Sequence, residues 1–281
     1  VTFFLYNSDW PDNNVKAYRS RNDGRYRFVS FDLDYAFKGC WPDDSNDNPF
    51  TNFARFKDEN GPHHNGAATI PNKEFVNLFL DLLKNDDYRK KFIDTFCLVG
   101  GSVFEPTRAN KIVDELLNKV KPMCDLMKQQ GLNDGHNPSN AANMIKNNLK
   151  GRSATMTNYL KQYTPMKLTS VTRQTVKLKS DNTDARLFVN GLAIPYTDFD
   201  GHLFAPVTLK AEAPAGYRFA GWKNGSTIVS TDAEMSLPSN ATVNLTATFT
   251  KLSDAELTAQ FITPVRINEV SADDGIYVND Y

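Results

Sequence analysis

The amino-acid sequence predicts an α+β chain of several domains, in which a mainly helical region is followed by a small antiparallel β domain. The chain has 281 residues, which favours two or three domains because an average domain contains about 150 residues. Residues 72–163 show the apolar spacing of helices, whereas residues 167–250 show short alternating strands rich in Thr and Val. We therefore expect domains at residues 1–165, 166–252 and 253–281.

The composition is that of a folded globular protein and argues against two classes of partner. Hydrophobic residues make up 40% and charged residues 23% of the chain, far from the signature of disorder. Lys and Arg number 32 against 33 Asp and Glu, so no basic excess indicates a nucleic-acid partner. No apolar run reaches the roughly 18 residues of a membrane span. Since the chain opens with Val1 rather than with Met or a signal segment, we expect its start to be internal to a longer protein.

Residues 1–70 are predicted to form strands and loops. The turn signal Asn22-Asp23-Gly24 precedes an aromatic-rich segment at residues 25–31. This pattern predicts a hairpin whose second strand ends at Asp32. Residues 39–69 are rich in Asp, Asn, Pro and Gly, which predicts a long irregular loop.

Four helices are expected next, because apolar residues recur there every three to four positions. Capping and breaking residues set their expected ends, which are Asn72 for the first, Asp86 or Asp87 and Gly100-Gly101 for the second, Pro106 and Gly131 for the third, and residues 139 and 163 for the fourth. The apolar stripes expected to face the core are Phe75, Leu78, Phe79 and Leu82 in the first helix, and Ile112, Leu116, Val120, Met123 and Met127 in the third.

Paired turn residues divide the β region into hairpins. Asn190-Gly191 and Asn224-Gly225 are typical of two-residue hairpin turns, and Pro214-Ala215-Gly216 predicts a further turn. Residues 243–249 alternate cleanly and predict a closing strand. Residues 265–270 predict one more strand, which opens a domain that the chain does not finish.

The strongest candidates for catalytic or metal-binding residues are Asp9 and Asn14, followed by Asp32 and Asp34 at the end of the predicted hairpin. Two carboxylates about 4 Å apart would repel by roughly 4 kcal/mol at an effective dielectric constant near 20, unless a divalent cation lies between them. A set of oxygen ligands suits Mg²⁺ or Mn²⁺ rather than zinc. On spacing alone, ordinary turns remain the favoured explanation, because Asp and Asn side chains bond their own backbone.

Several linked motifs resemble the catalytic half of CotH-type proteins, the spore-coat kinase family with many secreted bacterial relatives. They are Asp9-Trp10-Pro11 with Asn13-Asn14, the strand running into Phe31-Asp32-Leu33-Asp34-Tyr35-Ala36-Phe37, the segment from Asp87 to Phe96, and the segment from Leu149 to Tyr163 around Arg152. The resemblance covers residues 1–165 and implies a kinase-like C-terminal lobe.

The resemblance also implies an activity, which is phosphate transfer from ATP with Mg²⁺ or Mn²⁺. Asp9 would be the general base, Asn14 and Asp32 would bind the metal and nucleotide, and Asp34 would be an auxiliary metal ligand. The chain departs from the kinase pattern, since Asn7-Ser8 replaces His-Arg before Asp9, and Leu33-Asp34 follows Asp32 in place of Phe-Gly. The Gly-rich loop and the phosphate-pairing lysine are expected upstream of Val1, so residues 1–281 alone are expected to be inactive.

Two further resemblances concern the β region. Residues 213–222 resemble bacterial surface repeats related to the internalin B-repeat, and residues 265–270 resemble the first strand of a lamin-tail-type domain. By association, both imply an extracytoplasmic location, secreted or at the cell surface, with a protein or cell-surface substrate. Three hypotheses stay open, namely a secreted kinase, a non-catalytic adhesion or scaffold protein with a degenerate kinase-like domain, and a purely structural cation site.

Overall fold

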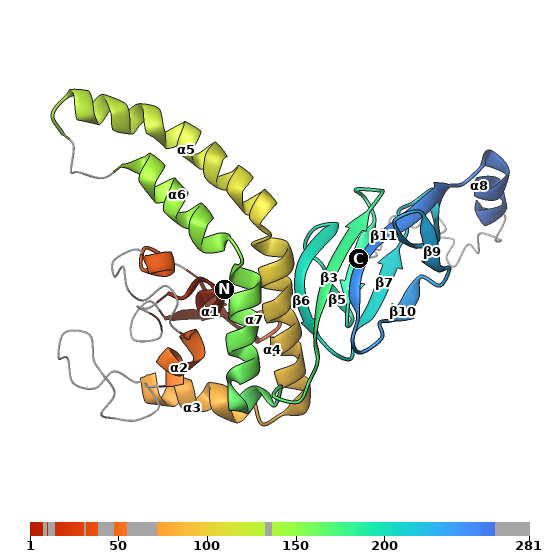
Figure 1. Cartoon of the computed structure of the whole chain (residues 1–281), viewed down its shortest axis with the longest axis horizontal. Helices are drawn as coiled ribbons and strands as arrows, with labels where there is room; N and C mark the ends of the chain where they lie inside the picture. The colour runs from red at the N-terminus through yellow and green to blue at the C-terminus, as the bar shows by residue number, and fades with distance from the viewer. Residues whose placement is uncertain are drawn as a thin grey trace, which may run out of the picture.

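The computed structural model divides into a helical part and a β part, which lie side by side (Figure 1). This arrangement confirms the predicted α+β class, with helices in the first half and mostly antiparallel sheets after them. The division of the chain into three domains stays a prediction. The structure describes residues 1–7, 10, 15–30, 32–38, 48–54, 72–132 and 137–261.

Side-chain caps define where several helices begin. Asn85 accepts a hydrogen bond from the Tyr88 amide to open the second predicted helix, and Glu105 accepts from Thr107 and Arg108 to open the third. The helical elements are α1 (Thr2–Leu5), η1 (Ala36–Lys38), α2 (Pro49–Ala54), α3 (Asn72–Leu82), α4 (Asp86–Leu98), η4 (Val99–Val103), α5 (Pro106–Gln129), α6 (Pro138–Leu149), α7 (Arg152–Gln162), η5 (Thr164–Met166) and α8 (Asp254–Phe261). Among the described residues, no helix is long and apolar enough to cross a membrane.

An aromatic core holds the short helix α1 at the centre of the helical part. Phe4 is 1% exposed and stacks on Phe104 at 5.5 Å between ring centroids. Phe3 lies within aromatic contact distance of five rings, those of Trp10, Phe50, Phe53, Phe79 and Phe92. Aromatic pairs of this kind add about 0.5–1.5 kcal/mol each beyond the area that they bury. These ring contacts therefore fix the position of the C-terminal end of α1.

Two predicted apolar stripes do not face the core as expected. In α3, Phe79 is buried and Phe75 packs against the core as predicted, but Leu78 and Leu82 are exposed. Val76, and Leu83 just after the helix, are buried in their place. In α5, the whole predicted stripe from Ile112 to Met127 is exposed. The reason is that α5 and α6 form an arm that extends from the body (Figure 1), so α5 meets α6 through a neighbouring face and most of its length has no core to cover.

The β part consists of two sheets that share one hydrophobic core. Its strands are β3 (Arg173–Ser180), β4 (Arg186–Val189), β5 (Leu192–Ala193), β6 (Asp198–Phe204), β7 (Thr208–Glu212), β8 (Tyr217–Asn224), β9 (Thr227–Ser230), β10 (Glu234–Ser236) and β11 (Thr242–Lys251). One sheet has the order β6-β3-β11-β8-β9 and the other β10-β7-β4-β5. All neighbours are antiparallel except β3 and β11, which pair in parallel.

The predicted turns lie where the sequence indicated. Asn190 and Gly191 have φ angles of 51° and 78°, the left-handed pair that a two-residue hairpin turn requires, and they join β4 to β5. Gly216 and Gly225 also have positive φ angles, at 80° and 59°. The predicted strand at residues 265–270 lies outside the described residues.

Two glycines bring the helical part into direct contact with the β part. A Cβ atom on Gly101 would lie 2.3 Å from Cε2 of Phe199 in β6, and one on Gly201 would lie 2.9 Å from Cα of Gly101. The prediction that the second helix ends at Gly100-Gly101 was wrong, because the helix continues there through the π-helical turn η4. Neither Gly100 nor Gly101 has a positive φ angle, so their role is close packing rather than helix capping.

A hydrogen-bonded pair reinforces this junction. The Asp94 side chain of α4 is 5% exposed, and its Oδ1 accepts a hydrogen bond from Nδ2 of Asn190 at 2.9 Å. Its other oxygen accepts from Nζ of Lys90 at 2.7 Å.

Replacing Asn190 with glycine tests this contact, because glycine keeps the left-handed turn and removes only the side chain. The Asp94 carboxylate then loses one buried partner, and the amide of Thr208 loses its bond to Asn190 Oδ1. We expect the free energy of unfolding to fall by about 1–3 kcal/mol, measured by urea titration. A double-mutant cycle with Asp94→Ala should give a coupling above about 0.5 kcal/mol, and strict additivity would contradict the direct contact.

Candidate functional site

The loop that begins at Asp32 follows a two-stranded hairpin, β1 (Lys16–Arg19) and β2 (Tyr26–Val29), as predicted. The structure describes Asp32 and Asp34, both exposed, whereas the predicted base Asp9 and ligand Asn14 lie outside the described residues. One Asp34 oxygen accepts a hydrogen bond from the Tyr35 amide at 3.0 Å. The roles assigned to all four residues stay predictions.

Asn7 joins the two segments that carry the predicted site. Its side chain is 4% exposed, and its Nδ2 donates a hydrogen bond to the carbonyl oxygen of Asp32 at 3.1 Å. Asn7 follows Tyr6, the residue that caps the end of α1, and comes two positions before Asp9. The start of the first motif and the end of the hairpin therefore meet in space, although 25 positions separate the bonded residues.

Backbone strain gathers around this meeting point. Asp32 has a φ angle of 52°, which aspartate tolerates, whereas Tyr6 and Phe37 have φ angles of 51° and 54°, in the left-handed region that residues other than Gly, Asn and Asp rarely adopt. Such residues cost about 1–3 kcal/mol each and persist only where their surroundings fix them, most often at functional sites. The loop from Asp32 to Phe37 is therefore held by its surroundings in a conformation that is unfavourable for its backbone.

Two side chains from the end of the helical domain support this loop, and sequence reasoning did not assign them a role. Nδ2 of Asn148 donates to the carbonyl oxygen of Phe37 at 3.2 Å. The guanidinium of Arg152 lies over the Phe37 ring, 4.9 Å from its centroid, and Nε donates to the carbonyl oxygen of Phe4 at 2.6 Å. The only sequence signal was the resemblance of the segment around Arg152 to the last helix of the family.

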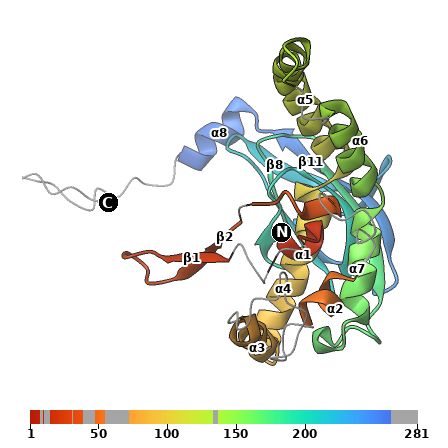
Figure 2. The ribbon, with the colours of Figure 1, turned by 90° about the vertical axis from the view of Figure 1, so that its left-hand side faces the viewer.

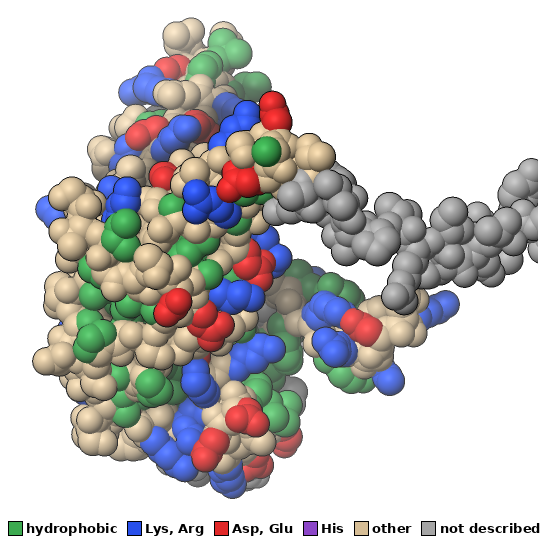
Figure 3. Space-filling view, turned by 90° about the vertical axis from the view of Figure 1, so that its right-hand side faces the viewer, with side chains coloured by type: hydrophobic (Ala, Val, Ile, Leu, Met, Phe, Trp, Pro, Cys, Tyr) green, Lys and Arg blue, Asp and Glu red, His purple; other side chains and the backbone are tan. Residues whose placement is uncertain are grey.

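The hairpin itself projects from the body of the molecule (Figure 2). Both of its strands are exposed throughout, and the space-filling view shows Lys and Arg side chains gathered on the projection (Figure 3). Phe28 is its aromatic contact with the body, since its ring meets that of Phe75 at 5.3 Å. Elsewhere on the face seen in Figure 3, positive and negative side chains are mixed.

A cavity of about 330 Å³ lies where the hairpin meets α1, α3 and α4. Most of its walls are apolar, and Trp10 connects it to the first motif. The lining is Val1, Thr2, Phe3, Trp10, Val15, Lys16, Phe28, Val29, Ser30, Phe75, Phe79, Tyr88 and Phe92. This chemistry suits an apolar group rather than a phosphate.

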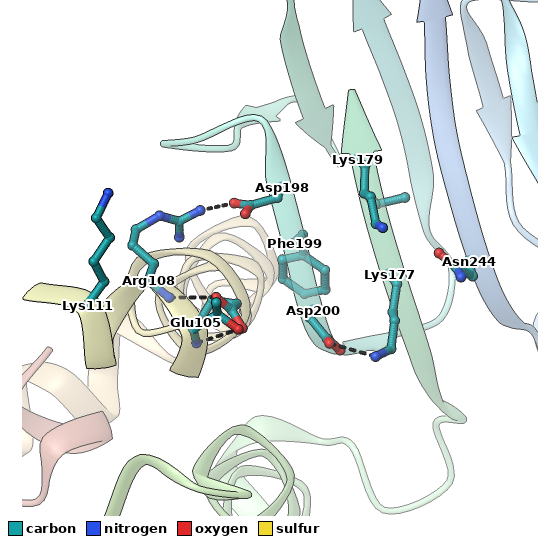
Figure 4. Close-up of a pocket in the computed structure, with 11 residues that line it drawn as sticks. Glu105, Arg108, Lys111, Lys177, Lys179, Asp198, Phe199, Asp200 and Asn244 are labelled. Atoms are coloured by element: carbon teal, nitrogen blue, oxygen red, sulfur yellow. Dashed lines mark hydrogen bonds and ion pairs between the residues drawn. The ribbon is translucent and has the colours of Figure 1, made fainter. Parts of the chain in front are cut away.

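A larger, polar cavity of about 570 Å³ lies at the junction of α5 with β6 and β3, away from the Asp32 loop (Figure 4). Most of the charged side chains that line it form ion pairs with one another. Arg108 pairs with Asp198, and Nζ of Lys177 lies 2.7 Å from Oδ2 of Asp200, an ion pair that raises the pKa of Lys177. We interpret this hollow as part of the contact between the helical and β parts.

The donor atoms near Asp32 fit a hard cation in kind, and the described residues supply only part of a site. Carboxylate oxygens are the ligands that Mg²⁺ and Mn²⁺ prefer, and Asp32 and Asp34 provide them. Among the described residues, no group of three or more His, Cys, Asp and Glu side chains gathers around one point. Whether Asp32 and Asp34 bind a metal stays a prediction.

Comparison with known families gives two matches. A family model described as CotH kinase protein matches residues 1–156, and one described as divergent InlB B-repeat domain matches residues 205–253. Both resemblances predicted from the sequence are thereby confirmed, whereas the lamin-tail-like start stays a prediction. Comparisons with curated proteins and with solved structures found no match.

Proposed function

Because the chain belongs to the CotH kinase protein family, we propose that it carries the metal-binding half of an ATP-dependent phosphotransferase, an atypical protein kinase. The family implies nucleotide and divalent-metal chemistry in general. The assignment to this chain rests on one observation above all, the hydrogen bond from Asn7 to Asp32. That bond joins the segment leading to Asp9 with the loop carrying the two carboxylates.

The proposed roles follow from where each group lies along these two segments. Asp9 accepts the proton of the acceptor hydroxyl, and Asn14 and Asp32 bind the metal. Asp34, two residues after Asp32, is an auxiliary ligand that can share the same cation. A bound Mg²⁺ or Mn²⁺ supplies neutralisation of the charge on the phosphates of ATP. An apolar cavity lies beside Trp10, the described residue of the first motif.

Phosphate transfer by the intact protein tests this function. We expect label from γ-³²P-ATP to enter the protein or an added protein acceptor only when Mn²⁺ or Mg²⁺ is present. A melting temperature that rises with metal but is unaffected by nucleotide would instead indicate a structural cation site.

The B-repeat match favours a location outside the cytoplasm. We propose that the intact protein is secreted or surface-associated and that its acceptor is a protein or another surface component. Fractionation of cells that produce the intact protein, followed by immunoblotting, tests this location. Recovery only in the cytoplasmic fraction would contradict it.

The same match supports a second candidate function, a surface scaffold whose kinase-like part is degenerate. In that case the β part carries the binding activity, and its extended contact with α4 and η4 holds it in a fixed orientation. Binding of the intact protein to the cell surface should then survive loss of the Asp32 carboxylate. Loss of surface binding together with phosphate transfer would favour the enzyme.

A further inference from the structure

Arg152, the first residue of α7, carries a buried charge without an anionic partner. Its side chain is 5% exposed, and no carboxylate among the described residues pairs with it. Nε donates a hydrogen bond to the carbonyl oxygen of Phe4, but Nη2 has no hydrogen-bond partner among the residues that the structure describes. Burial lowers the pKa of the guanidinium to about 10, so the group still carries its charge at neutral pH.

This arrangement is unfavourable for folding stability. A buried charge without a counter-ion costs more free energy than its packing returns, and apolar side chains of similar volume often replace such groups without loss. A methionine or leucine at this position would fill the space beside Phe4 and Phe37 and leave no unpaired donor. Packing alone therefore does not explain an arginine here.

What distinguishes Arg152 is the pair of segments that it contacts. Its guanidinium carbon lies 4.9 Å from the centroid of the Phe37 ring and 5.8 Å from that of Phe4. Phe37 ends the strained loop that starts at Asp32, and Phe4 belongs to α1, which leads to Asn7. A methionine could touch both rings, but it could neither donate to the Phe4 carbonyl nor attract the ring faces as a cation does.

We propose that Arg152 is a positioning residue, which locks the loop from Asp32 to Phe37 onto α1 and thereby fixes the two carboxylates relative to α1 and Asn7. Its role toward a metal rests on the proposed function, whereas its role in ordering the loop does not. Asn148, which bonds the Phe37 carbonyl, supports the same loop from the preceding helix.

The test compares Arg152→Met with the wild-type intact protein by two measurements. Hydrogen exchange, followed by mass spectrometry, reports the order of residues 32–38, and electron paramagnetic resonance of free Mn²⁺ reports metal affinity in the absence of ATP, which would itself chelate the ion. We expect amide exchange in residues 32–38 to be at least about tenfold faster, because the strained loop loses its anchor. We expect Mn²⁺ affinity to fall about 10- to 100-fold, as for other residues that orient metal ligands.

Arg89→Met provides a matched control. Arg89 is also a buried arginine near the start of a helix, 9% exposed, and its Nη1 donates to the carbonyl oxygen of Leu83 at 2.7 Å. It does not contact the Asp32 loop in the described structure. We expect this variant to lower the melting temperature and to leave both the exchange of residues 32–38 and Mn²⁺ affinity unchanged.

Phe37→Leu keeps the test decisive if Arg152→Met does not fold, because it removes only the ring beneath the guanidinium. It should speed exchange in the same residues and weaken Mn²⁺ binding. Unchanged exchange in both variants would overturn the proposal, as would faster exchange with undiminished Mn²⁺ affinity. If the wild type binds no Mn²⁺ but exchange still rises, the proposed enzymatic function fails and the ordering of the loop by Arg152 stands.

Discussion

Replacing Asp32 with asparagine is expected to reduce phosphate transfer by the intact protein about 100- to 1,000-fold, the usual effect of removing one charge that stabilises the reacting groups. Asparagine has nearly the same shape as aspartate and also tolerates the left-handed conformation observed at φ 52°. The bond from Asn7 goes to the main-chain carbonyl, so it survives the substitution. The melting temperature should therefore change little.

Two further substitutions make this result specific. Asp34→Asn, in the auxiliary position, should reduce transfer less, by about tenfold. Asp184→Asn alters an exposed turn in the β part and should have no effect. Retained activity in Asp32→Asn would remove Asp32 from the metal-binding role, whereas an equal loss in all three variants would indicate a nonspecific effect of charge.

Replacing Gly101 with alanine is expected to destabilise the fold by about 3 kcal/mol, toward the upper end of what overpacking a core costs. The new Cβ would lie 2.3–2.8 Å from three atoms of the Phe199 ring. Phe199 is 1% exposed, and its ring would have to shift to admit the new methyl group. For a protein of this size the melting temperature should fall by roughly 6–12 °C, which differential scanning calorimetry measures.

A second substitution in the same contact identifies the cause. Phe199→Leu in the Gly101→Ala background removes the clashing ring edge, so the double variant should be more stable than additivity predicts. Ser102→Ala, at a neighbouring position that is 0% exposed, serves as control because its hydroxyl has no partner in the described part of the chain. If Gly101→Ala proves as stable as the wild type, the backbones of η4 and β6 are not in the close contact described.

Gly100 and Gly101 show a limit of structure prediction from local sequence signals. A Gly-Gly pair after a helical stretch predicts a C-cap, because glycine tolerates the left-handed cap conformation. In the structure, Gly100 and Gly101 lie in a π-helical turn, and their missing side chains admit Phe4 and Phe199. Those two residues are distant along the chain, so no local window contains the reason for the glycines.

The third helix shows a similar limit for apolar patterns. Its period was predicted correctly, and α5 forms over Pro106–Gln129. The stripe from Ile112 to Met127 is nevertheless exposed, because amphipathic spacing shows that a helix has an apolar face but not whether another element covers it.

The sequence by itself determined the α+β class, the family, the hairpin before Asp32 and the turns of the β part, since these depend on local periodicity, turn chemistry and linked motifs. Only the tertiary structure decided that Asn7 meets Asp32, that Arg152 supports Phe37, and that η4 lies directly on β6. Each of these contacts joins residues from different segments, and their partners are fixed by how whole elements pack rather than by neighbouring residues. The positions of Asp32 and Asp34 therefore depend on an arginine more than a hundred positions away.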